Sequence, residues 1–600
     1  MENRITTCRS SASSRVLVSI LVILLHSYLS HGLELQDYQT LSFSNPNQSL
    51  EFTRIAVHNE TGSIYIGGAD KLYRLSADFE PQESVDTDVS CGEDSCPLNY
   101  NKILLVDDRR SMLVTCGSES IGANSGADRK GTCQIRSLNS IATPLRDDDS
   151  VVVASGKLST EAVIAPGPEN GGVDTLYVAA TYDENRYGDV KPMSRRSYAA
   201  SQASDLIFNT ERYATILLDL AKYPATPFLI NYVYGFVNEH KASSSHYTYF
   251  VTSQRPDFTT RQDKTYVSKI NRVCQNFDFR SHAEITLGCQ GASPTNKYMY
   301  NLVQAAYVGP AGADLAATLG LNAGDDVMYG VFAKNQGEDG NIPSNKSALC
   351  IFKLEDIGEK FIDGIHGCLR EAGDYRLRYL AGTQCLGNSM VTREQAIGQQ
   401  CSAQNWANAD EFNPLESTAV IEWSDIIPSS IITTTHRSHT IAFVGTTDGQ
   451  LVKTHIVKSD EGREYERFSL GAASSPAGQV LRDAHLDGDQ EHVTLLTEQK
   501  LIKLNVSNCD VYKTCDECVI LNGDPYCGWC VQGNRCTRFD ECEMADDPKG
   551  WSPHDCIEPT TEPEPTPEPT TLASDSRAAN VLQPIGLLVG IALGMAVFIA

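Results

Sequence analysis

The stretch RIAVHNETGSIYIGGADKLYRLSADF, at Arg54–Phe79, decides the fold class of this chain. It contains three short apolar and aromatic runs, at Ile55–Val57, Ser63–Ile66 and Lys71–Leu75. Clusters of Gly, Asp and Asn separate these runs. Short β-branched and aromatic runs between such clusters are typical of antiparallel strands. The stretch therefore predicts three consecutive short strands.

The same pattern recurs from about Leu33 to Asn508. Further strand candidates lie at Lys102–Val106, Met112–Cys116, Thr175–Thr181, Tyr247–Thr252, Ala348–Leu354, Thr440–Val444 and Gln450–Ile456. Helical periodicity is scarce, and Ala305–Gly320 is either one helix or a loop insertion. About 475 residues of short strands are too many for one sandwich, whereas radial repetition closes such a sheet without long exposed edges. We therefore expect an all-β fold, and seven four-stranded blades of about 68 residues would fit it. No clean internal repeat is visible.

The composition excludes one class of partner. The 600 residues include 49 Lys and Arg against 76 Asp and Glu, which gives a net charge of −27. Binding to a nucleic-acid backbone depends on clustered positive charge, so we expect no nucleic-acid partner. Hydrophobic residues make up 41% of the chain and charged residues only 21%. This balance indicates a folded protein rather than a disordered one.

Residues 1–32 have the form of a secretory signal. A basic start precedes the apolar run Val16–Leu25, and small residues follow it. The run is short for a membrane span, so cleavage after Gly32 is favoured over a signal anchor. Of the 19 Cys, Cys8 lies in the signal, and in a secreted chain the other 18 are expected to form disulfides. Four sequons for N-glycosylation follow, at Asn47, Asn59, Asn345 and Asn505.

The segment Cys509–Cys556 contains eight of these Cys in 48 residues. So short a segment buries little apolar surface, and disulfides would replace that burial as its source of stability. CGWC at Cys527–Cys530 also matches a redox motif, and with CDEC at Cys515–Cys518 it matches a zinc site. Structural disulfides are favoured over the redox motif because the compartment is oxidising. They are favoured over zinc because a zinc site would leave four Cys without a role.

The C-terminal residues 557–600 indicate attachment to a membrane. Glu558–Thr571 is rich in Pro, Thr and Glu, which keep a chain extended, so residues 557–584 are an expected stalk and spacer. Residues 585–600 are apolar to the last residue. Small residues, a spacer and an apolar end match a GPI attachment signal, with Ser574 or Ser576 as the attachment residue. The alternatives are a single membrane span, genuine or at the end of a truncated gene model, and release from the cell.

Two charged stretches are candidate sites of another kind. Asp483–Glu491 (DAHLDGDQE) is rich in carboxylates, but its spacing does not match an EF-hand. A solvated turn between two strands is therefore favoured there over a calcium site. Arg195 and Arg196 match a protease site or a contact for an acidic partner, and an ordinary solvated loop is favoured over both. The chain has no zinc-protease, serine-hydrolase, phosphate-loop or dinucleotide motif, so we expect no enzyme activity, no metal and no cofactor.

The cysteine-rich segment resembles a PSI domain, and DPYCGWC at Asp524–Cys530 is its most specific part. Semaphorins usually have Asp at the position of Cys530, and a Cys there resembles the plexin form. The resemblance implies a PSI domain at residues 509–556.

The larger region, residues 33–508, resembles a plexin sema domain. The matching stretches are Arg54–Phe79, Asn101–Ser118, Gly131–Leu138, Asn231–Phe236, Lys264–Phe279 and Ala348–Ile357. Ile441–Ile456 resembles the last-blade signature of sema domains. The resemblance implies a seven-bladed sema β-propeller, and the hepatocyte-growth-factor receptor group, which shares this fold, is the nearest alternative. Plexins continue through further extracellular domains, a membrane span and a cytoplasmic GTPase-activating region, so their signalling activity is not carried over.

The resemblance also implies a disulfide pairing, which spacing alone leaves open because eight Cys allow 105 pairings. The implied pairs in the propeller are Cys91–Cys96, Cys116–Cys133, Cys274–Cys401, Cys289–Cys350 and Cys368–Cys385. The implied pairs in the PSI domain are Cys509–Cys527, Cys515–Cys556, Cys518–Cys536 and Cys530–Cys542.

Together these features predict a binding protein on the extracellular face of the plasma membrane. A rigid propeller face suits protein recognition because binding then costs little ordering. The resemblance implies a semaphorin as the ligand and a role in axon guidance, as a receptor, decoy, ligand presenter or co-receptor without a cytoplasmic signalling region. The alternatives are a semaphorin-like guidance ligand, the truncated N-terminal part of a signalling plexin, and a redox enzyme that uses CGWC. No motif indicates the ligand-contact residues or the oligomeric state.

Overall fold

The computed structural model describes the chain in segments between residues 34 and 556. These are residues 34–87, 97–119, 131–148, 153–167, 174–181, 192–199, 207–209, 230–240, 245–255, 265–277, 279–293, 299–337, 340–370, 377, 379–380, 385, 387–401, 407–409, 413–471, 478–521, 523–547 and 549–556. The expected signal, the C-terminal tail with Ser574 and Ser576, and the expected pair Cys91–Cys96 lie outside them.

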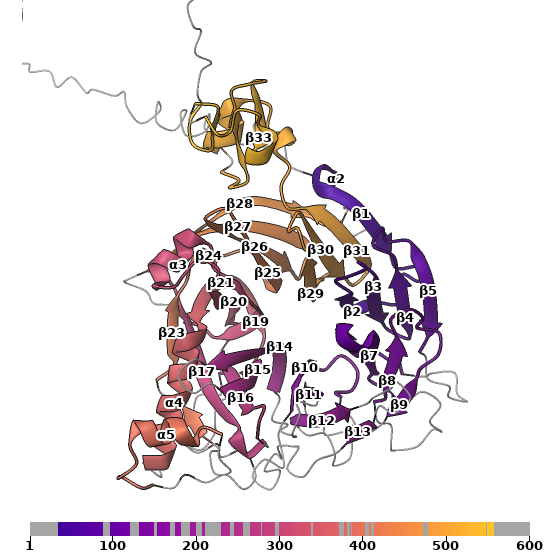
Figure 1. Ribbon diagram of the computed structural model, residues 1–600, viewed down its shortest axis with the longest axis vertical. Helices are drawn as coiled ribbons and strands as arrows, with labels where there is room; N and C mark the ends of the chain where they lie inside the picture. Colours follow the sequence, from indigo (N-terminus) through magenta and orange to yellow (C-terminus); the bar gives the residue numbers. More distant parts are fainter. Residues whose placement is uncertain are drawn as a thin grey trace, which may run out of the picture. The chain divides into compact units, whose positions relative to one another are not determined.

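Seven antiparallel sheets, which we call blades 1 to 7, are arranged in a ring (Figure 1). Blade 1 contains β2 (Phe52–Val57), β3 (Ile64–Gly68), β4 (Lys71–Leu75) and β5 (Pro81–Asp86). Blade 2 contains β6 (Asn101–Asp107), β7 (Met112–Gly117), β8 (Cys133–Ser137) and β9 (Arg146–Asp148). Blade 3 contains β10 (Thr160–Pro166), β11 (Asp174–Ala180), β12 (Met193–Ala199) and β13 (Ile207–Asn209).

Blades 4 and 5 are joined by strands that follow a helical insertion. Blade 4 contains β14 (Ile230–His240), β15 (Ser245–Gln254), β16 (Val267–Cys274), β17 (Ala283–Gln290) and β18 (Met299–Tyr300). Two later strands, β22 (Ala407–Ala409) and β23 (Leu415–Thr418), pair in parallel with β17. Blade 5 contains β19 (Leu302–Pro310), β20 (Asp326–Asn335), β21 (Pro343–Lys353) and β24 (Ile421–Trp423).

The last two blades complete the ring. Blade 6 contains β25 (Pro428–His436), β26 (His439–Thr446), β27 (Gln450–Lys458) and β28 (Glu461–Ser469). Blade 7 contains β29 (Val480–Leu486), β30 (His492–Thr497), β31 (Lys500–Asn505) and β1 (Gln39–Ser44). The first strand of each blade contacts that of the next, and β29 contacts β2 again.

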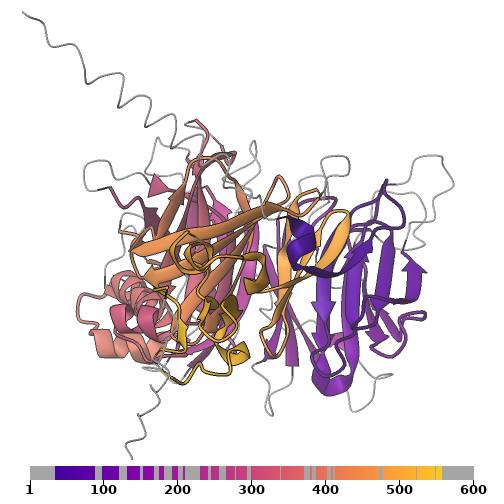
Figure 2. The same cartoon turned by 90° about the horizontal axis from the view of Figure 1, so that it is seen from above.

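The N-terminal strand closes the propeller. β1 pairs antiparallel with β31, with Phe43 opposite Leu501. Figure 2 shows this strand, in indigo, beside the yellow-orange strands of blade 7. Apolar packing continues across the joint, because Phe52, Ile66 and Tyr73 of blade 1 form one buried cluster with Leu501. Hydrogen bonding between the two ends of the propeller covers the edge that an open sheet would expose.

The all-β propeller expected from the sequence is confirmed, and each predicted strand overlaps a strand of a blade. Ser63, Thr181 and Leu354 lie just outside the observed strands, and Leu354 begins the helix α4 (Leu354–Arg370). The interpretation of Ala305–Gly320 was wrong in its first part, because residues 305–310 belong to β19 and only α3 (Ala313–Leu319) is helical. Ala305 and Ala306 are good helix formers, but here they line the crowded centre of the ring. The stretch Ile441–Ile456 lies in blade 6 rather than in the last blade.

Two further expectations need correction. The helix α4 (Leu354–Arg370) was not predicted from the sequence. It buries Ile357, Phe361 and Ile365, which are spaced four residues apart, and α5 (Arg393–Gln399) follows it. The expected solvated loop at Arg195 and Arg196 is part of β12, where the two residues are 2% and 5% exposed. Arg195 donates a hydrogen bond to the carbonyl of Phe277, so this segment is not open to a protease.

The PSI domain is a small sheet that follows blade 7. It contains β32 (Cys527–Cys530), β33 (Arg535–Arg538) and β34 (Trp551–Ser552), with β32 in the middle. A one-turn helix, α2 (Leu35–Tyr38), lies just before β1. Among the described residues, no helix has both the length and the apolar character needed to cross a bilayer.

Candidate functional site: the channel and the PSI junction

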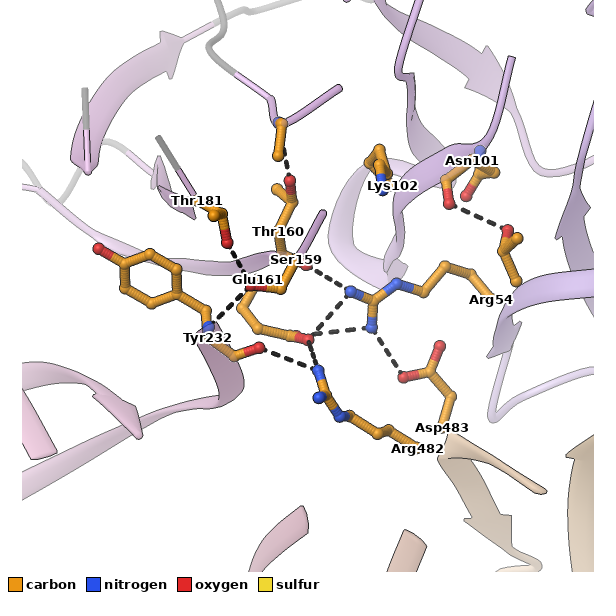
Figure 3. Close-up of polar contacts among 12 residues, drawn as sticks. Arg54, Asn101, Lys102, Ser159, Thr160, Glu161, Thr181, Tyr232, Arg482 and Asp483 are labelled. Carbon is orange, nitrogen blue, oxygen red and sulfur yellow. Dashed lines mark hydrogen bonds and ion pairs between the residues drawn. The ribbon is translucent and has the colours of Figure 1, made fainter. Parts of the chain in front are cut away.

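Charged side chains from three blades meet in the channel at the centre of the ring (Figure 3). A cavity of about 260 Å³ lies there between the first strands of all seven blades. Arg54 Nη2 lies 3.0 Å from Glu161 Oε1, and Arg54 Nη1 lies 3.1 Å from Asp483 Oδ1. Arg482 Nη1 donates to the carbonyl of Tyr232 at 2.9 Å and lies 3.7 Å from Glu161 Oε1. We call Arg54, Glu161, Arg482 and Asp483 the channel network.

The network balances its own charge. Burial raises the pKa of Glu161, and Arg54 and Arg482 oppose that rise. Burial alone would lower the pKa of Arg54, but Glu161 and Asp483 together raise it. A neighbouring cavity of about 360 Å³ is lined by a further ion pair, in which Lys157 Nζ lies 2.6 Å from Glu51 Oε1. Lys102 at the same cavity donates a hydrogen bond to the backbone carbonyl of Leu158. These contacts connect different blades, which indicates a structural role rather than a reactive one.

Replacing Arg54 by methionine should lower the free energy of unfolding by about 2 kcal/mol, because Glu161 and Asp483 lose a partner in a largely buried setting. Urea denaturation of the purified ectodomain measures this change. Lys71→Met is the matched control in the same blade. Lys71 pairs with Asp86 at 2.5 Å, but Asp86 is 71% exposed, so the expected cost is below about 1 kcal/mol. Equal losses in the two variants would contradict a structural role for the channel network.

The PSI junction is built on a buried ion pair of blade 6. Lys453 Nζ on β27 lies 2.5 Å from Glu466 Oε2 on β28, and the two side chains are 1% and 0% exposed. The other carboxylate oxygen of Glu466 accepts hydrogen bonds from the hydroxyls of Tyr38, at 2.5 Å, and Tyr512. Tyr38 precedes β1 and Tyr512 belongs to the PSI domain. One carboxylate therefore connects the N-terminal segment, the propeller and the PSI domain.

A second carboxylate, Asp524 of the PSI domain, is buried beside this pair. Burial raises its pKa to about 7, with Lys453 opposing the rise and Glu466 adding to it. Asp524 Oδ1 accepts from the backbone amide of Tyr526 at 2.9 Å. Lys453 is thus the ammonium that pairs with Glu466 and also acts on the nearby carboxylate of Asp524. We call Lys453, Glu466 and Asp524 the acidic cluster of the junction.

A basic cluster lies at the same junction. Arg437 packs over the rings of Phe539, at 4.1 Å, and Trp551, at 5.4 Å. Arg538 of the PSI domain forms an ion pair with Glu491 of the propeller, with Nη2 at 2.7 Å from Oε1. His436 stacks on Tyr526, with ring centroids 4.2 Å apart.

Gly523 provides a close approach of the two domains. Arg463 Nη2 on β28 donates to the carbonyl of Gly523 at 3.1 Å. Gly523 has a φ of +66°, and a Cβ atom at this position would lie 1.2 Å from the Arg463 guanidinium. The left-handed conformation therefore favours glycine at this position, and a side chain here would displace the Arg463 guanidinium from its contact.

The sequence analysis did not find the junction residues Lys453, Glu466, Tyr38 and Tyr512. One signal was present, because Lys453 interrupts the apolar run of Gln450–Ile456. A charge inside such a run is rarely buried without a partner. Its partner cannot be read from the sequence, because the contacts join residues that are far apart in the chain.

The structure joins eight of the expected Cys pairs by disulfides. They are Cys116–Cys133, Cys274–Cys401, Cys289–Cys350, Cys368–Cys385, Cys509–Cys527, Cys515–Cys556, Cys518–Cys536 and Cys530–Cys542. Cys527 and Cys530 are thus bonded to different partners, and a redox motif would need them bonded to each other. The sulfurs of Cys509, Cys527 and Cys536 lie close together, but sulfurs in disulfides are not thiolate ligands for zinc.

The expected solvated turn at Asp483–Glu491 is confirmed only in part, because residues 487–491 form a turn between β29 and β30. Residues 483–486 belong to β29, where Asp483 pairs with Arg54 in the channel. Asp487 and Asp489 of this turn and His492, the first residue of β30, have potential metal-ligand atoms close together. Lys503 Nζ, however, lies 2.6 Å from Asp487 Oδ2. Three of the sequon asparagines are exposed and one is partly exposed: Asn47, Asn59 and Asn345, and Asn505, respectively. Glycosylation at these four positions stays a prediction.

Two family models match this chain. A model described as "Sema domain" matches residues 303–483, and one described as "Plexin repeat" matches residues 508–557. Neither describes an enzyme. The second match covers the cysteine-rich segment, and the first covers blades 5 and 6 with the start of blade 7.

The relatives with similar sequences include plexins. Plexin-A4 of Danio rerio is 27% identical over 561 residues, covering 86% of this chain and 27% of the relative. Plexin-A4 of Homo sapiens is 28% identical over 565 residues, covering 85% of this chain and 27% of the relative. The chain thus spans about a quarter of the length of the curated relatives it matches.

Solved structures show the same arrangement. The extracellular region of Plexin A4 (domains 1 to 8) superposes with a TM-score of 0.72 at 26% identity, over 86% of this chain and 56% of the other. A structure of Drosophila Plexin A in complex with Semaphorin 1b has a TM-score of 0.56 at 14% identity, over 86% of this chain and 96% of the other. The second likeness concerns the fold alone.

Proposed function

We propose that this chain, which carries a Sema domain followed by a PSI domain and is homologous to plexin-A extracellular regions, is a cell-surface protein that binds a semaphorin. The observation that carries the proposal is the likeness to the Plexin A4 extracellular region over 86% of the chain, through propeller and PSI domain alike. A related plexin has been solved in complex with a semaphorin. The closed ring and the buried PSI junction support a pre-organised binding body, which loses little conformational freedom on association.

A binding assay tests this function. The secreted ectodomain, residues 33–556, is immobilised and exposed to a panel of semaphorin ectodomains, with a plexin-A ectodomain as the positive control. We expect saturable binding of at least one semaphorin. Failure of the whole panel to bind, while the plexin control binds, would overturn the proposal.

The finer role depends on the C-terminal tail. We propose that residues 557–600 direct GPI attachment at Ser574 or Ser576, which would make the chain a decoy, a ligand presenter or a co-receptor. Phosphatidylinositol-specific phospholipase C should release the full chain from the cell surface, with a known GPI-anchored protein as the control. Retention would favour a membrane span, and a transcript that continues into a cytoplasmic region would identify the chain as the N-terminal part of a signalling plexin.

A semaphorin-like ligand is the second candidate. Drosophila Semaphorin 1b superposes with a TM-score of 0.57, below the 0.72 of the plexin. Ligand-type sema propellers usually form homodimers, so the mass of the ectodomain in solution separates the two roles. A dimer that binds plexins and no semaphorin would favour the ligand role. The third alternative, a redox enzyme that uses CGWC, requires reactive thiols. Free-thiol titration of the ectodomain tests for them.

A further inference from the structure

His436 lies at the end of β25, where the propeller meets the PSI domain. Its ring stacks on Tyr526 at a tilt of 31°. Its Nε2 atom is buried and has no hydrogen-bond partner among the described residues. The stack depends on the PSI domain, since Tyr526 belongs to it. A change in the charge of His436 therefore acts directly on the contact between the two domains.

The groups that face His436 are mostly cationic. Arg437 follows it in the sequence and packs on the PSI rings of Phe539 and Trp551. Arg538 comes from β33 on the PSI side and is held there by Glu491 and Asp540. His439 approaches from β26, and Asp540 is the carboxylate that partly offsets these charges. Protonation of His436 would thus add a positive charge beside two arginines in a partly buried contact.

We propose that His436 is an acid-sensitive contact of the junction: protonation of its imidazole weakens the docking of the PSI domain on the propeller.

The direction of the effect follows from the pKa of His436. Burial, together with Arg538 and Arg437, lowers this pKa to about 4, from an ordinary value of 6.5. A group with a lowered pKa favours the docked state fully above pH 6.5, and this contribution is lost as the pH falls toward 4. If the pKa returned fully to 6.5 on undocking, the docking equilibrium would weaken about 30-fold between pH 7.5 and pH 5 through His436 alone. Because Arg437 and His439 stay beside His436 in the propeller, this factor is the upper bound.

Other groups at the junction also titrate and must be separated from His436. The raised pKa of Asp524 acts in the opposite direction, because its protonation favours the docked, buried state. His439, which lies 3.0 Å from Asp314, and His455, which faces Arg463, also have lowered pKa values. The net pH profile is a sum of these effects. The test therefore compares variants that differ only at His436.

Hydrogen–deuterium exchange of the glycosylated ectodomain tests the proposal. Exchange of PSI peptides from residues 523–547 is followed between pH 7.5 and 4.5 and corrected for the intrinsic pH dependence of exchange, with propeller peptides in the same sample as the control for global unfolding. His436→Gln and His436→Phe both remove the titrating group, and Phe keeps the stack on Tyr526. His246→Gln, at an exposed histidine of β15 that is 61% exposed, is the matched control.

The expected result is a ratio of PSI opening constants, wild type to His436→Phe, that rises from pH 7.5 to pH 5 by up to about 30-fold. His246→Gln should follow the wild type at every pH. Parallel pH curves for the wild type and His436→Phe would overturn the proposal. If His436→Gln fails to fold, His436→Phe decides alone. If His436→Phe also fails to fold at neutral pH, Arg437→Met decides: removing one facing cation raises the pKa of His436, and its PSI opening must then change less with acid than that of the wild type.

Discussion

Replacing Lys453 by methionine should lower the free energy of unfolding by about 3–5 kcal/mol, the cost typical of breaking a buried ion pair from one side. The side chain of Lys453 is 1% exposed and lies 2.5 Å from Glu466. Without the ammonium, Glu466 and Asp524 are two buried carboxylates with no cation between them. One of them must then take up a proton or draw in water, and either response weakens the PSI junction. Denaturant unfolding of the ectodomain, followed by circular dichroism, measures the loss.

Lys458→Met is the matched control for this prediction. Lys458 ends the same strand, β27, and lies 2.6 Å from Glu461, but the two side chains are 52% and 56% exposed. An exposed pair of this kind contributes little to stability, because water and salt screen both charges. The two substitutions therefore remove the same charge from ion pairs of nearly the same length, and the pairs differ chiefly in burial. A Lys453→Met loss as small as that of Lys458→Met would show that the acidic cluster does not hold the junction together.

The fold could be predicted from the sequence where a local pattern determines the structure. Arg54–Phe79 predicts strands because its apolar runs and turn residues alternate over a few residues, and β2, β3 and β4 lie there. The prediction failed where position in the ring overrides local preference. Ala305 and Ala306 favour a helix locally, but they lie in β19, the innermost strand of blade 5, where they pair with Val331 and Gly330 of β20. The missed helix α4 did carry a signal, the four-residue spacing of Ile357, Phe361 and Ile365.

The candidate site could not be predicted as well as the fold, for a physical reason. Tyr38 and Glu466 meet although 428 residues separate them, because ring closure by β1 brings the N-terminal segment beside blade 6. Nothing in either local sequence indicates the other. The disulfide pairing was implied by family resemblance, since spacing leaves it open. Charged residues inside apolar runs are the one local signal that pointed to the junction.

Replacing both Cys289 and Cys350 by alanine should lower the free energy of unfolding by about 4 kcal/mol, the value that loop-closure entropy gives for a bridge that closes a loop of this length. The bond connects β17 of blade 4 with β21 of blade 5 across 61 residues. The unfolded chain gains the freedom that this bridge removes, and the contact between the two blades loses a covalent link.

The bridge Cys116–Cys133 provides the control for this last prediction. It joins the adjacent strands β7 and β8 of blade 2 across 17 residues, so the same entropy gives about 3 kcal/mol for its removal. Both double variants are compared under non-reducing conditions by urea unfolding, with mass spectrometry to verify the remaining bonds. Loop length then predicts the larger loss for the pair between blades. A larger loss for Cys116→Ala/Cys133→Ala would contradict the loop-entropy argument. Such a result would indicate that the bonds stabilise the protein mainly through local packing within a blade. Cys116 and Cys133 are both buried and lie opposite each other on paired strands.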